Sequence, residues 1–209
     1  ALQAKPNDQN PQHIEYYNGL YLFDGKNVPE RLYSKSHLVP FGEYIPFQKY
    51  IPLKPVVEFT GFQKGLGPRT SYIDNYPSFT TLICYEIIFP HQVVDKNSTR
   101  PDYILTITND AWYGDSPGPH QHFAQARFRA IEQGLPVVRS ANTGISGLID
   151  PYGRVVEKTN LLESASVTVR LPHKLEKATF YSLHGDKIYI ALFIFFFGIA
   201  ILGKVKKLT

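Results

Sequence analysis

The sequence has almost no cysteine and no methionine. Its 209 residues include one cysteine, Cys84, which excludes an internal disulfide framework and a cysteine-based zinc site. The sequence also has little net charge outside its C-terminal tail. Lys204, Lys206 and Lys207 contribute three units of the formal net charge of +4, so the rest of the chain carries a net charge of +1. This charge is too small for the positive surface that binds nucleic acid, so we expect no nucleic-acid partner.

Charge is missing altogether from residues 188–203, near the C-terminus. At about 1.5 Å per residue this stretch covers roughly 24 Å of helix, a little less than the roughly 30 Å of a bilayer core, and flanking lysines can snorkel to close the gap. A buried core helix is the alternative, although such a helix is seldom apolar on every face. We therefore expect a globular domain over 1–186, then a transmembrane helix and a basic tail over 187–209. The lysines that follow the span place the C-terminus in the cytoplasm and the domain on the other side of the membrane.

The first residues have the composition of a loop and not that of a domain's beginning. Residues 1–10 are polar and contain proline and asparagine, and no initiator methionine precedes them. We therefore expect that material N-terminal to Ala1 is missing. An aromatic strand is predicted over 16–23, followed by a turn at 24–27 and a returning strand over 28–35.

The rest of the chain alternates strand and helix patterns, which indicates a mixed-sheet α/β layered domain. Expected strands cover 79–84, 101–108, 137–140 and 166–171, with a hairpin over 144–157, and expected helices cover 87–97 and 119–134. Residues 48–67 form a long loop whose apolar side chains have no clear period. Beside a membrane, such a loop suits a lid or a lipid contact.

Cys84 follows the apolar, β-branched run 79–83 and precedes Tyr85 and Glu86. Two interpretations are open. A lone cysteine in such a run is more often a small core hydrophobe. Alternatively, a thiol at the carboxyl end of a strand, with basic residues nearby to favour the thiolate, has what a nucleophile needs.

Six separate segments, in order, resemble the carbon–nitrogen hydrolase (nitrilase) superfamily. They are 33–43 (YSKSHLVPFGE), 83–86 (ICYE), 108–114 (TNDAWYG), 118–123 (GPHQHF), 127–132 (RFRAIE) and 139–146 (RSANTGIS). Within the superfamily the chain most resembles the membrane enzymes that N-acylate bacterial lipoproteins. The resemblance implies an αββα sandwich, incomplete at its N-terminus, with the hydrophobic span at the position of that family's last membrane helix. The chain would be a C-terminal portion of such a protein.

The resemblance also implies the catalytic residues. The family uses a Glu-Lys-Cys triad, in which Cys84 is the nucleophile and Lys35 stabilises the oxyanion together with the Tyr85 backbone N–H. Glu43 matches a second glutamate that orients the site in this family. Without the resemblance, a glutamate in such a loop would be interpreted as a solvated carboxylate. Glu86 would support the turn that follows the nucleophile.

The triad's base glutamate lies upstream of the lysine hairpin in this family. Glu15 and Glu30 are the only glutamates before Lys35, and neither has the expected strand-end context. We therefore expect the chain to be inactive or only weakly active on its own. Asn109 and Trp112 follow a strand end and are expected on the substrate side, although Trp112 is as readily a core aromatic.

Several polar residues of the predicted helix over 119–134 have structural explanations. His120 and His122 are two residues apart, a poor spacing for joint metal binding on a helix, so packing or capping is expected and no metal site. We expect a structural ion-pair set on this helix, formed by Arg127, Arg129 and Glu132. Arg139 is expected to have a structural ion pair as well.

The implied reaction is a ping-pong acyl transfer without metal or organic cofactor. A phospholipid would donate an acyl chain to Cys84 as a thioester, and the amine of a diacylglyceryl-cysteine lipoprotein would accept it. The domain would lie on the periplasmic face of the inner membrane, as a monomer. Two alternatives stay open: an amidase or nitrilase of the same superfamily, and a membrane-anchored remnant that lacks the base.

Overall fold

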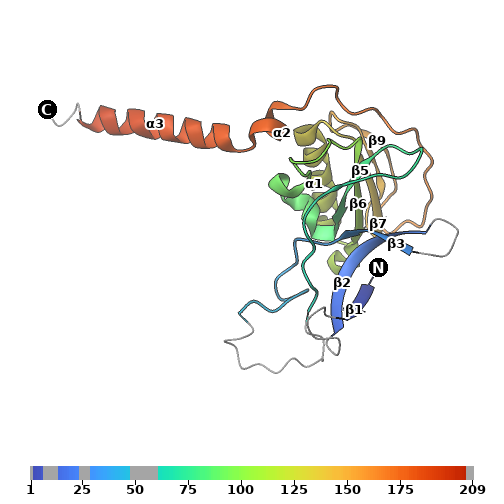
Figure 1. Cartoon of the computed structure of the whole chain (residues 1–209). Helices are drawn as coiled ribbons and strands as arrows, with labels where there is room; N and C mark the ends of the chain where they lie inside the picture. Colours follow the sequence, from blue (N-terminus) through green and yellow to red (C-terminus); the bar gives the residue numbers. More distant parts are fainter. Residues whose placement is uncertain (1, 7–13, 24–28, 48–60, 206–209) are drawn as a thin grey trace.

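The computed structural model describes residues 2–6, 14–23, 29–47 and 61–205. The turn expected at 24–27 and most of the loop expected over 48–67 lie outside these residues, as does the end of the basic tail. Within them, two sheets and two helices form a body from which a third, long helix projects (Figure 1).

The larger sheet has six strands in the order β4-β5-β6-β7-β8-β9. Their bounds are β4 Thr70–Ser71, β5 Phe79–Ile83, β6 Tyr103–Asn109, β7 Val137–Asn142, β8 Gly147–Ile149 and β9 Val155–Lys158. Strands β5, β6 and β7 are parallel, and the outer pairs are antiparallel. The carboxyl ends of the three parallel strands therefore meet at one edge of the sheet. The predicted strands over 79–84, 101–108 and 137–140 and the hairpin over 144–157 are confirmed.

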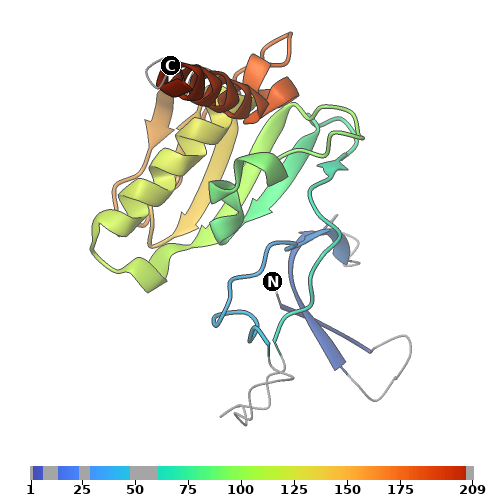
Figure 2. The same cartoon turned by 90° about the vertical axis from the view of Figure 1, so that its left-hand side faces the viewer.

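The smaller sheet is an antiparallel meander of β1 Leu2–Pro6, β2 Ile14–Phe23 and β3 Pro29–Ser34. It lies below the six-stranded sheet in Figures 1 and 2. The predicted strands of the hairpin are confirmed. The predicted loop over 1–10 is wrong for the five residues of β1, which pair with β2 from Leu2–Asn18 to Pro6–Ile14. An edge strand is held by backbone pairing, so its side chains need not be apolar.

Helix α1, Pro117–Gln133, covers one face of the six-stranded sheet (Figure 2). The Ser116 hydroxyl caps its N-terminus by accepting the Gly118 N–H, and proline at the first helical position suits that start. Gly134 ends the helix in the left-handed conformation at φ 62°. The core between α1 and the sheet consists of fully buried apolar side chains: Leu82, Ile87, Val93, Ile104, Phe123, Ala126, Ala130, Leu135, Val137, Ile145 and Ile149.

Two expected elements differ from the structure. The helix predicted over 87–97 is present only as two short 3-10 turns, η1 Cys84–Ile88 and η2 Pro90–Gln92. The strand predicted over 166–171 is wrong, because these residues are neither strand nor helix. Their valines, Val167 and Val169, are both 40% exposed, so the alternating pattern has no sheet to pack against.

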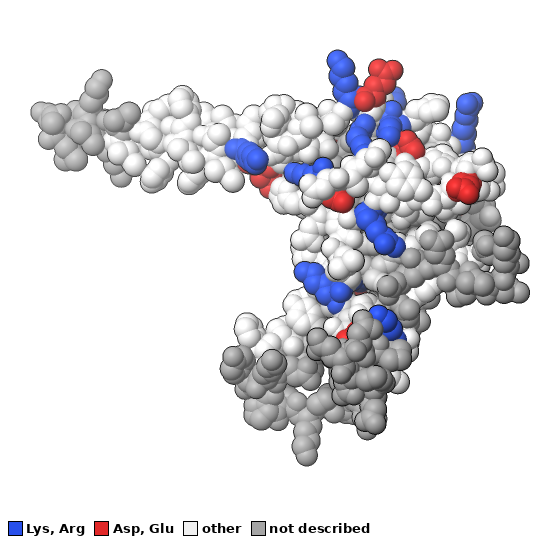
Figure 3. Space-filling model, viewed as in Figure 1, with Lys and Arg blue, Asp and Glu red and all other residues white. Residues whose placement is uncertain are grey.

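Helices α2 Phe180–His184 and α3 Lys187–Val205 end the described chain. Helix α3 projects from the body and carries almost no charge along its length (Figures 1 and 3). Its apolar side chains are solvent-exposed, among them Phe193 at 69%. The helical part of the expectation for 187–209 is therefore confirmed. In the described part of the chain, however, no helix combines the length and apolarity needed to cross a membrane.

Of the expected αββα sandwich, the described residues supply one helical layer on a mixed sheet and a second, smaller sheet. A further 3-10 turn, η3 Asp110–Tyr113, follows β6 directly. Together with η1 it places polar side chains at the carboxyl edge of the parallel strands. That edge is where open α/β sheets usually carry their sites.

Candidate active site

Cys84 lies at the carboxyl end of β5, as the first residue of η1. It is the chain's free cysteine and is only partly buried, whereas the five residues of β5 before it are all buried. Its φ of 55° is in the left-handed region, which costs a non-glycine residue on the order of 1–3 kcal/mol. A small core hydrophobe does not require such a backbone. The partial exposure and the strained turn favour the nucleophile over the core interpretation.

Glu86, two residues after Cys84, is 2% exposed and accepts five hydrogen bonds. Its Oε1 receives the Tyr33 hydroxyl at 2.9 Å, the Ser36 N–H at 2.7 Å, the Ser36 hydroxyl at 3.0 Å and the His37 N–H at 2.9 Å. Its Oε2 receives the Ile83 N–H at 2.8 Å. A buried carboxylate is stable only with such compensation, so these donors hold Glu86 in one position.

The tyrosine among these donors stays protonated. Burial, followed by the charge of Glu86, raises the pKa of Tyr33 far above its ordinary value. A protonated Tyr33 therefore remains a donor to Glu86 throughout the physiological range.

Lys35 is 1% exposed and directs its Nζ at both carboxylate oxygens of Glu43, at 2.8 and 2.7 Å. Glu43 also accepts the Val39 N–H at 2.8 Å, which closes the loop between the two residues. An ammonium carries three donors, so one N–H of Lys35 remains available for a further acceptor. The ordinary interpretation of Glu43 as a solvated loop carboxylate is therefore wrong, because its carboxylate pairs with a buried lysine.

Glu86 joins the lysine segment to the cysteine turn. The residues after Lys35, Ser36 and His37, donate to the same carboxylate oxygen, while Ile83, just before Cys84, donates to the other. Glu86 therefore links the backbones of the two segments through hydrogen bonds, although they are about 50 residues apart in sequence. Lys35, with its partner Glu43, and Cys84 lie on the two segments that Glu86 joins.

A second buried network lies behind the turn that follows Cys84. Asp110 Oδ1 is 2.9 Å from His122 Nδ1, and Asp110 Oδ2 accepts from Arg139 at 2.7 Å. His122 Nε2 in turn is 3.2 Å from the Cys84 carbonyl oxygen, which can only accept, so a hydrogen bond between them is donated by Nε2–H. These three side chains are almost completely buried and connect η3, α1 and β7 to the Cys84 backbone.

The negative charge of Asp110 and the positive charge of Arg139 stabilise each other in this network. Burial by itself raises the pKa of Asp110, but its contacts with His122 and Arg139 outweigh burial and hold that pKa below its usual value. Burial lowers the pKa of Arg139, and the neighbouring Asp110 opposes this change. The aspartate is therefore ionised at neutral pH, with the guanidinium as its counter-charge.

The remaining predicted site residues differ in how far their side chains are exposed to solvent. Tyr85 is 39% exposed and its ring is edge-on to Phe89. Trp112, in η3, is 88% exposed, so the core interpretation of this tryptophan is wrong. The Asn109 side chain accepts the Ala111 N–H at 3.2 Å, so it caps η3.

Asp110 and Tyr113 were missed by the sequence analysis. Burial, followed by the charge of Cys84, raises the pKa of Tyr113, whose ring also contacts His122 edge-on. The signal was available for Asp110, since it follows a strand end in the same motif as Asn109 and Trp112. His122 was expected to have a packing or capping role, and it is indeed buried, but no local pattern relates it to Asp110 or Arg139.

The expected ion-pair set on α1 is confirmed in part. Arg129 pairs with Glu132 at 2.9 Å. Arg127 instead donates to the Gly153 carbonyl oxygen at 2.9 Å, and Arg139 pairs with Asp110 in η3. Among the described residues no group of three or more histidine, cysteine or acidic side chains is arranged to hold a metal ion.

Comparison with known proteins identifies the family of the chain. A family model described as carbon-nitrogen hydrolase matches residues 3–179, so the chain belongs to the carbon–nitrogen hydrolase family. The fold resembles the crystal structure of a carbon-nitrogen hydrolase from Helicobacter pylori G27, with a TM-score of 0.52 and 16% identity over 72% of this chain and 55% of that one.

Within this family the chain is similar to curated apolipoprotein N-acyltransferases. It is 46% identical over 192 residues to that of Rickettsia bellii (strain RML369-C), which covers 91% of this chain and 38% of the relative. It is 41% identical over 191 residues to that of Rickettsia prowazekii (strain Madrid E), which covers 90% and 38%. The chain thus spans about 38% of the length of these relatives, and the resemblance inferred from its motifs is confirmed.

The Glu86 contacts predict the effect of Glu86→Gln. The substitution removes the negative charge and replaces one carboxylate oxygen with an NH₂ group, which is a donor and therefore cannot accept the hydrogen bonds made there. The loss should lower the unfolding free energy by at least about 2 kcal/mol. It should also speed hydrogen exchange at the Ser36, His37 and Ile83 amides by tenfold or more at equal temperature. Glu157→Gln, at an exposed position of β9, is the matched control and should change neither quantity. Unchanged exchange at Ser36 and His37 in Glu86→Gln would show that the carboxylate does not join the two segments.

The lowered pKa of Asp110 predicts how stability depends on pH. A carboxyl whose pKa is lower in the folded state stabilises that state above its unfolded pKa of about 3.9, and this contribution is lost as the pH falls toward the folded pKa. Asp110→Asn should therefore destabilise the chain at pH 7, and the difference from wild type should narrow below about pH 4. Urea unfolding between pH 3 and 7 measures this, with Asp115→Asn, at an exposed site, as the control. A difference that stays constant over this range would contradict the ionised Asp110.

Proposed function

We propose that this chain forms the C-terminal catalytic part of an apolipoprotein N-acyltransferase, with Cys84 as the acyl-carrying nucleophile. One observation carries the proposal: Glu86 binds the backbone of two segments, of which one carries a buried lysine and the other a strained, partly exposed cysteine. The similarity to curated apolipoprotein N-acyltransferases supports the substrate class.

The proposed first step is acylation of Cys84. The thiolate attacks the carbonyl carbon of a phospholipid acyl ester, and the carbonyl electron pair moves onto oxygen to give a tetrahedral oxyanion. The N–H of Lys35 that Glu43 leaves available, together with the Tyr85 backbone N–H, stabilises this oxyanion. The C–O ester bond then breaks, a lysophospholipid leaves with the proton taken from the thiol, and a thioester remains on Cys84.

The proposed second step regenerates the thiol. The α-amine of a diacylglyceryl-cysteine lipoprotein attacks the thioester carbonyl, the C–N amide bond forms and the C–S bond breaks. The amine's proton returns to the cysteine sulfur through the base. No metal or organic cofactor enters this sequence of bonds.

The general base is proposed to be a carboxylate outside this chain. Three described carboxylates near Cys84 are already engaged: Glu43 by Lys35, Glu86 by its five donors, and Asp110 by His122 and Arg139. A base must accept a proton from the thiol or amine, and a carboxylate saturated with donors is poorly suited to that. The 209-residue chain alone should therefore be inactive.

The proposed location is the periplasmic face of the bacterial inner membrane, with α3 entering the bilayer. Its exposed apolar surface and the absence of charge over 188–203 support this location, and so do the lysines at and beyond Lys204. The described helix falls short of a full span, so lysine snorkelling or local thinning of the bilayer is part of the proposal.

Replacement of the nucleophile tests the reaction. In the whole protein, Cys84→Ala should abolish transfer of label from a phospholipid to a lipoprotein peptide, and Cys84→Ser should retain less than about one part in a thousand, because an alkoxide is not generated as readily as a thiolate. Initial rates with both substrates varied should give the parallel double-reciprocal lines of a ping-pong reaction in the wild type. Retained transfer by Cys84→Ala would overturn the proposal.

Replacement of the lysine tests the oxyanion contact. Lys35→Met should lower kcat by about 10²–10³-fold, and Lys35→Arg should not restore it, because a planar guanidinium cannot replace a compact ammonium between Glu43 and the oxyanion. Lys158→Met, at an exposed position of β9, is the control and should leave kcat unchanged. Near-normal turnover with Lys35→Arg would show that the lysine is only structural.

Fusion reporters test the orientation. A reporter fused after Thr209 should be active in the cytoplasm, and one fused at Lys174, before α2, should be active only outside it. Both fusions should be made in the whole protein. Cytoplasmic activity of the Lys174 fusion would place Cys84 in the wrong compartment and contradict lipoprotein acylation.

A further inference from the structure

Helix α3 is joined to the body of the protein at a glycine. Helix α2 is followed by Gly185, whose φ of 57° lies in the left-handed region that glycine adopts readily, and α3 begins at Lys187. The described side chains of α3 are solvent-exposed from its first residue, so their packing does not fix the direction of the helix (Figure 1). A junction of this kind acts as a hinge unless other contacts hold it.

Asp186, between Gly185 and α3, makes contacts that hold this junction. Its Oδ2 is 2.7 Å from His91 Nε2, and its Oδ1 accepts the Tyr181 hydroxyl at 3.0 Å. Tyr181, followed by His91, holds the pKa of Asp186 below its usual value, so the carboxylate is ionised at neutral pH and accepts from both partners. The Asp186 carbonyl oxygen accepts the Ile190 N–H at 3.2 Å, so the same residue belongs to the start of α3.

The two partners are themselves held at the hinge. The rings of His91 and Tyr181 are stacked, with an interplanar angle of 22° and centroids 6.3 Å apart. His91 also packs on the glycine, because an added Cβ at Gly185 would lie 3.4 Å from the imidazole. The Ser182 hydroxyl fastens α2 to the end of α1 by donating to Gln133 Oε1 at 3.0 Å. An exposed ion pair alone contributes little, but here it acts together with a ring contact and with packing on the hinge itself.

His91 belongs to η2, and the residues around it contact both segments of the candidate active site. Phe89 stacks on the His37 ring of the lysine segment with centroids 3.7 Å apart. The Tyr85 ring of the cysteine turn lies edge-on to Phe89 at 6.1 Å. Gln92 Oε1 is 2.9 Å from His37 Nδ1. Residues 89–92 therefore lie between the base of α3 and the segments that carry the lysine and the cysteine.

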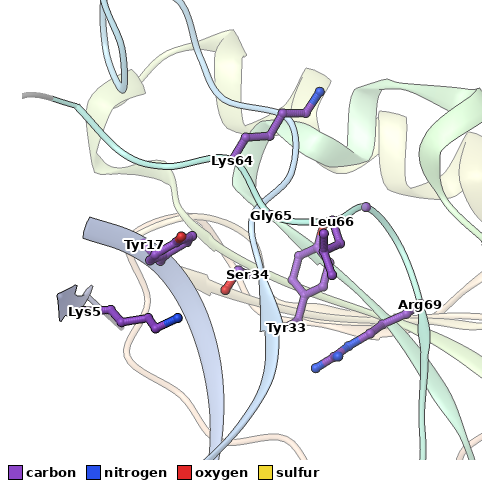
Figure 4. Close-up of a pocket in the computed structure, with 9 residues that line it drawn as sticks. Lys5, Tyr17, Tyr33, Ser34, Lys64, Gly65, Leu66 and Arg69 are labelled. Atoms are coloured by element: carbon purple, nitrogen blue, oxygen red, sulfur yellow. The ribbon is translucent and has the colours of Figure 1, made fainter. Parts of the chain in front are cut away.

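The lysine segment is also anchored independently of η2. Figure 4 shows the chain at Gly65 beside Ser34 and Tyr33 of β3. The Gly65 N–H donates to the Lys35 carbonyl oxygen at 2.8 Å, and an added Cβ at Gly65 would collide with the Ser34 carbonyl oxygen. Residues 89–92 thus connect α3 to a part of the site that other contacts already hold in place.

We propose that His91 and Asp186 are positioning residues that set the direction of α3 relative to the Cys84 turn. The contacts run from α3 through Asp186, His91 and Phe89 to the lysine and cysteine segments. The inference deepens the proposed function and rests on it in one respect: a helix held at a fixed angle in the bilayer presents the thiol to membrane phospholipid at a fixed height. The hinge contacts themselves do not depend on acyl transfer.

The direction of α3 is measurable as a distance between the helix and the body. Nitroxide amino acids encoded at Phe197 of α3 and Lys158 of β9, both exposed, leave Cys84 unmodified. Double electron–electron resonance of the whole protein in detergent micelles should give one narrow distance distribution. His91→Leu should broaden it by at least about twofold, because the Gly185 hinge is released. His91→Gln should restore the narrow distribution, since its amide N–H is able to replace the Nε2–H donor.

His173→Leu, at an exposed histidine outside the hinge, is the matched control and should leave the distribution narrow. Asp186→Asn gives a second measurement if His91→Leu disturbs η2. It should also broaden the distribution, because it removes the negative charge and one acceptor oxygen. A broad distribution in the wild type, or one that stays equally narrow in His91→Leu and Asp186→Asn, would overturn the proposal.

The consequence for the reaction is tested with a donor in the bilayer and a probe in solution. In the whole protein, His91→Leu should lower kcat for transfer from phospholipid vesicles by about two- to fivefold, the effect of losing an exposed ion pair. Iodoacetamide should still alkylate Cys84 at the wild-type rate, because the cysteine turn is unchanged, and His91→Gln should restore transfer. Unchanged transfer in His91→Leu, or an equal loss of both rates, would overturn the positioning role. If the wild type transfers no acyl chain, the proposed function fails, and the distance measurement still decides whether the contact positions α3.

Discussion

The Glu86 carboxylate is the interaction on which the candidate site depends. It is almost completely buried, and that is tolerable only because five donors surround it. The donors come from the hairpin strand, from the segment after Lys35 and from the end of β5. A single buried carboxylate therefore joins segments that are distant in the sequence. One of these segments carries the lysine and the other the cysteine.

The second network has a different effect. Asp110, His122 and Arg139 are buried together, and His122 contacts the carbonyl oxygen of Cys84. The cysteine's left-handed backbone is strained, and strain persists where the surroundings over-determine it. Glu86 on one side and His122 on the other provide that constraint, so the thiol is presented at the end of β5 by two independent sets of contacts.

Local patterns in the sequence identified the candidate site residues but not the hydrogen bonds that hold them in place. The apolar run before Cys84 indicated β5, and proline with Gly134 bounded α1, because both signals depend on neighbouring residues. Lys35, Glu43, Cys84 and Glu86 were identified through motifs. Their hydrogen bonds were not, since a bond between Ser36 and Glu86 spans 50 positions that no local pattern relates.

The failed predictions have the same physical origin. Residues 166–171 alternate like a strand, but a strand also needs a partner, and the described sheet ends at β9. Strand β1 has no such pattern and forms because β2 offers an edge. Asp110 is recognisable as a strand-end acid, yet its importance depends on Arg139 and His122, which reach it from two other elements.

The central claim is that the fold presents Cys84 as an acyl carrier, and the most direct measurement is the mass of its peptide. The whole protein should be incubated with a phospholipid and no lipoprotein acceptor, then digested and analysed by mass spectrometry. The account predicts one acyl chain on the peptide that contains Cys84, removed by neutral hydroxylamine as a thioester is, and discharged by an acceptor amine. An acyl chain on another residue, or continued transfer with Cys84 unmodified throughout turnover, would contradict it.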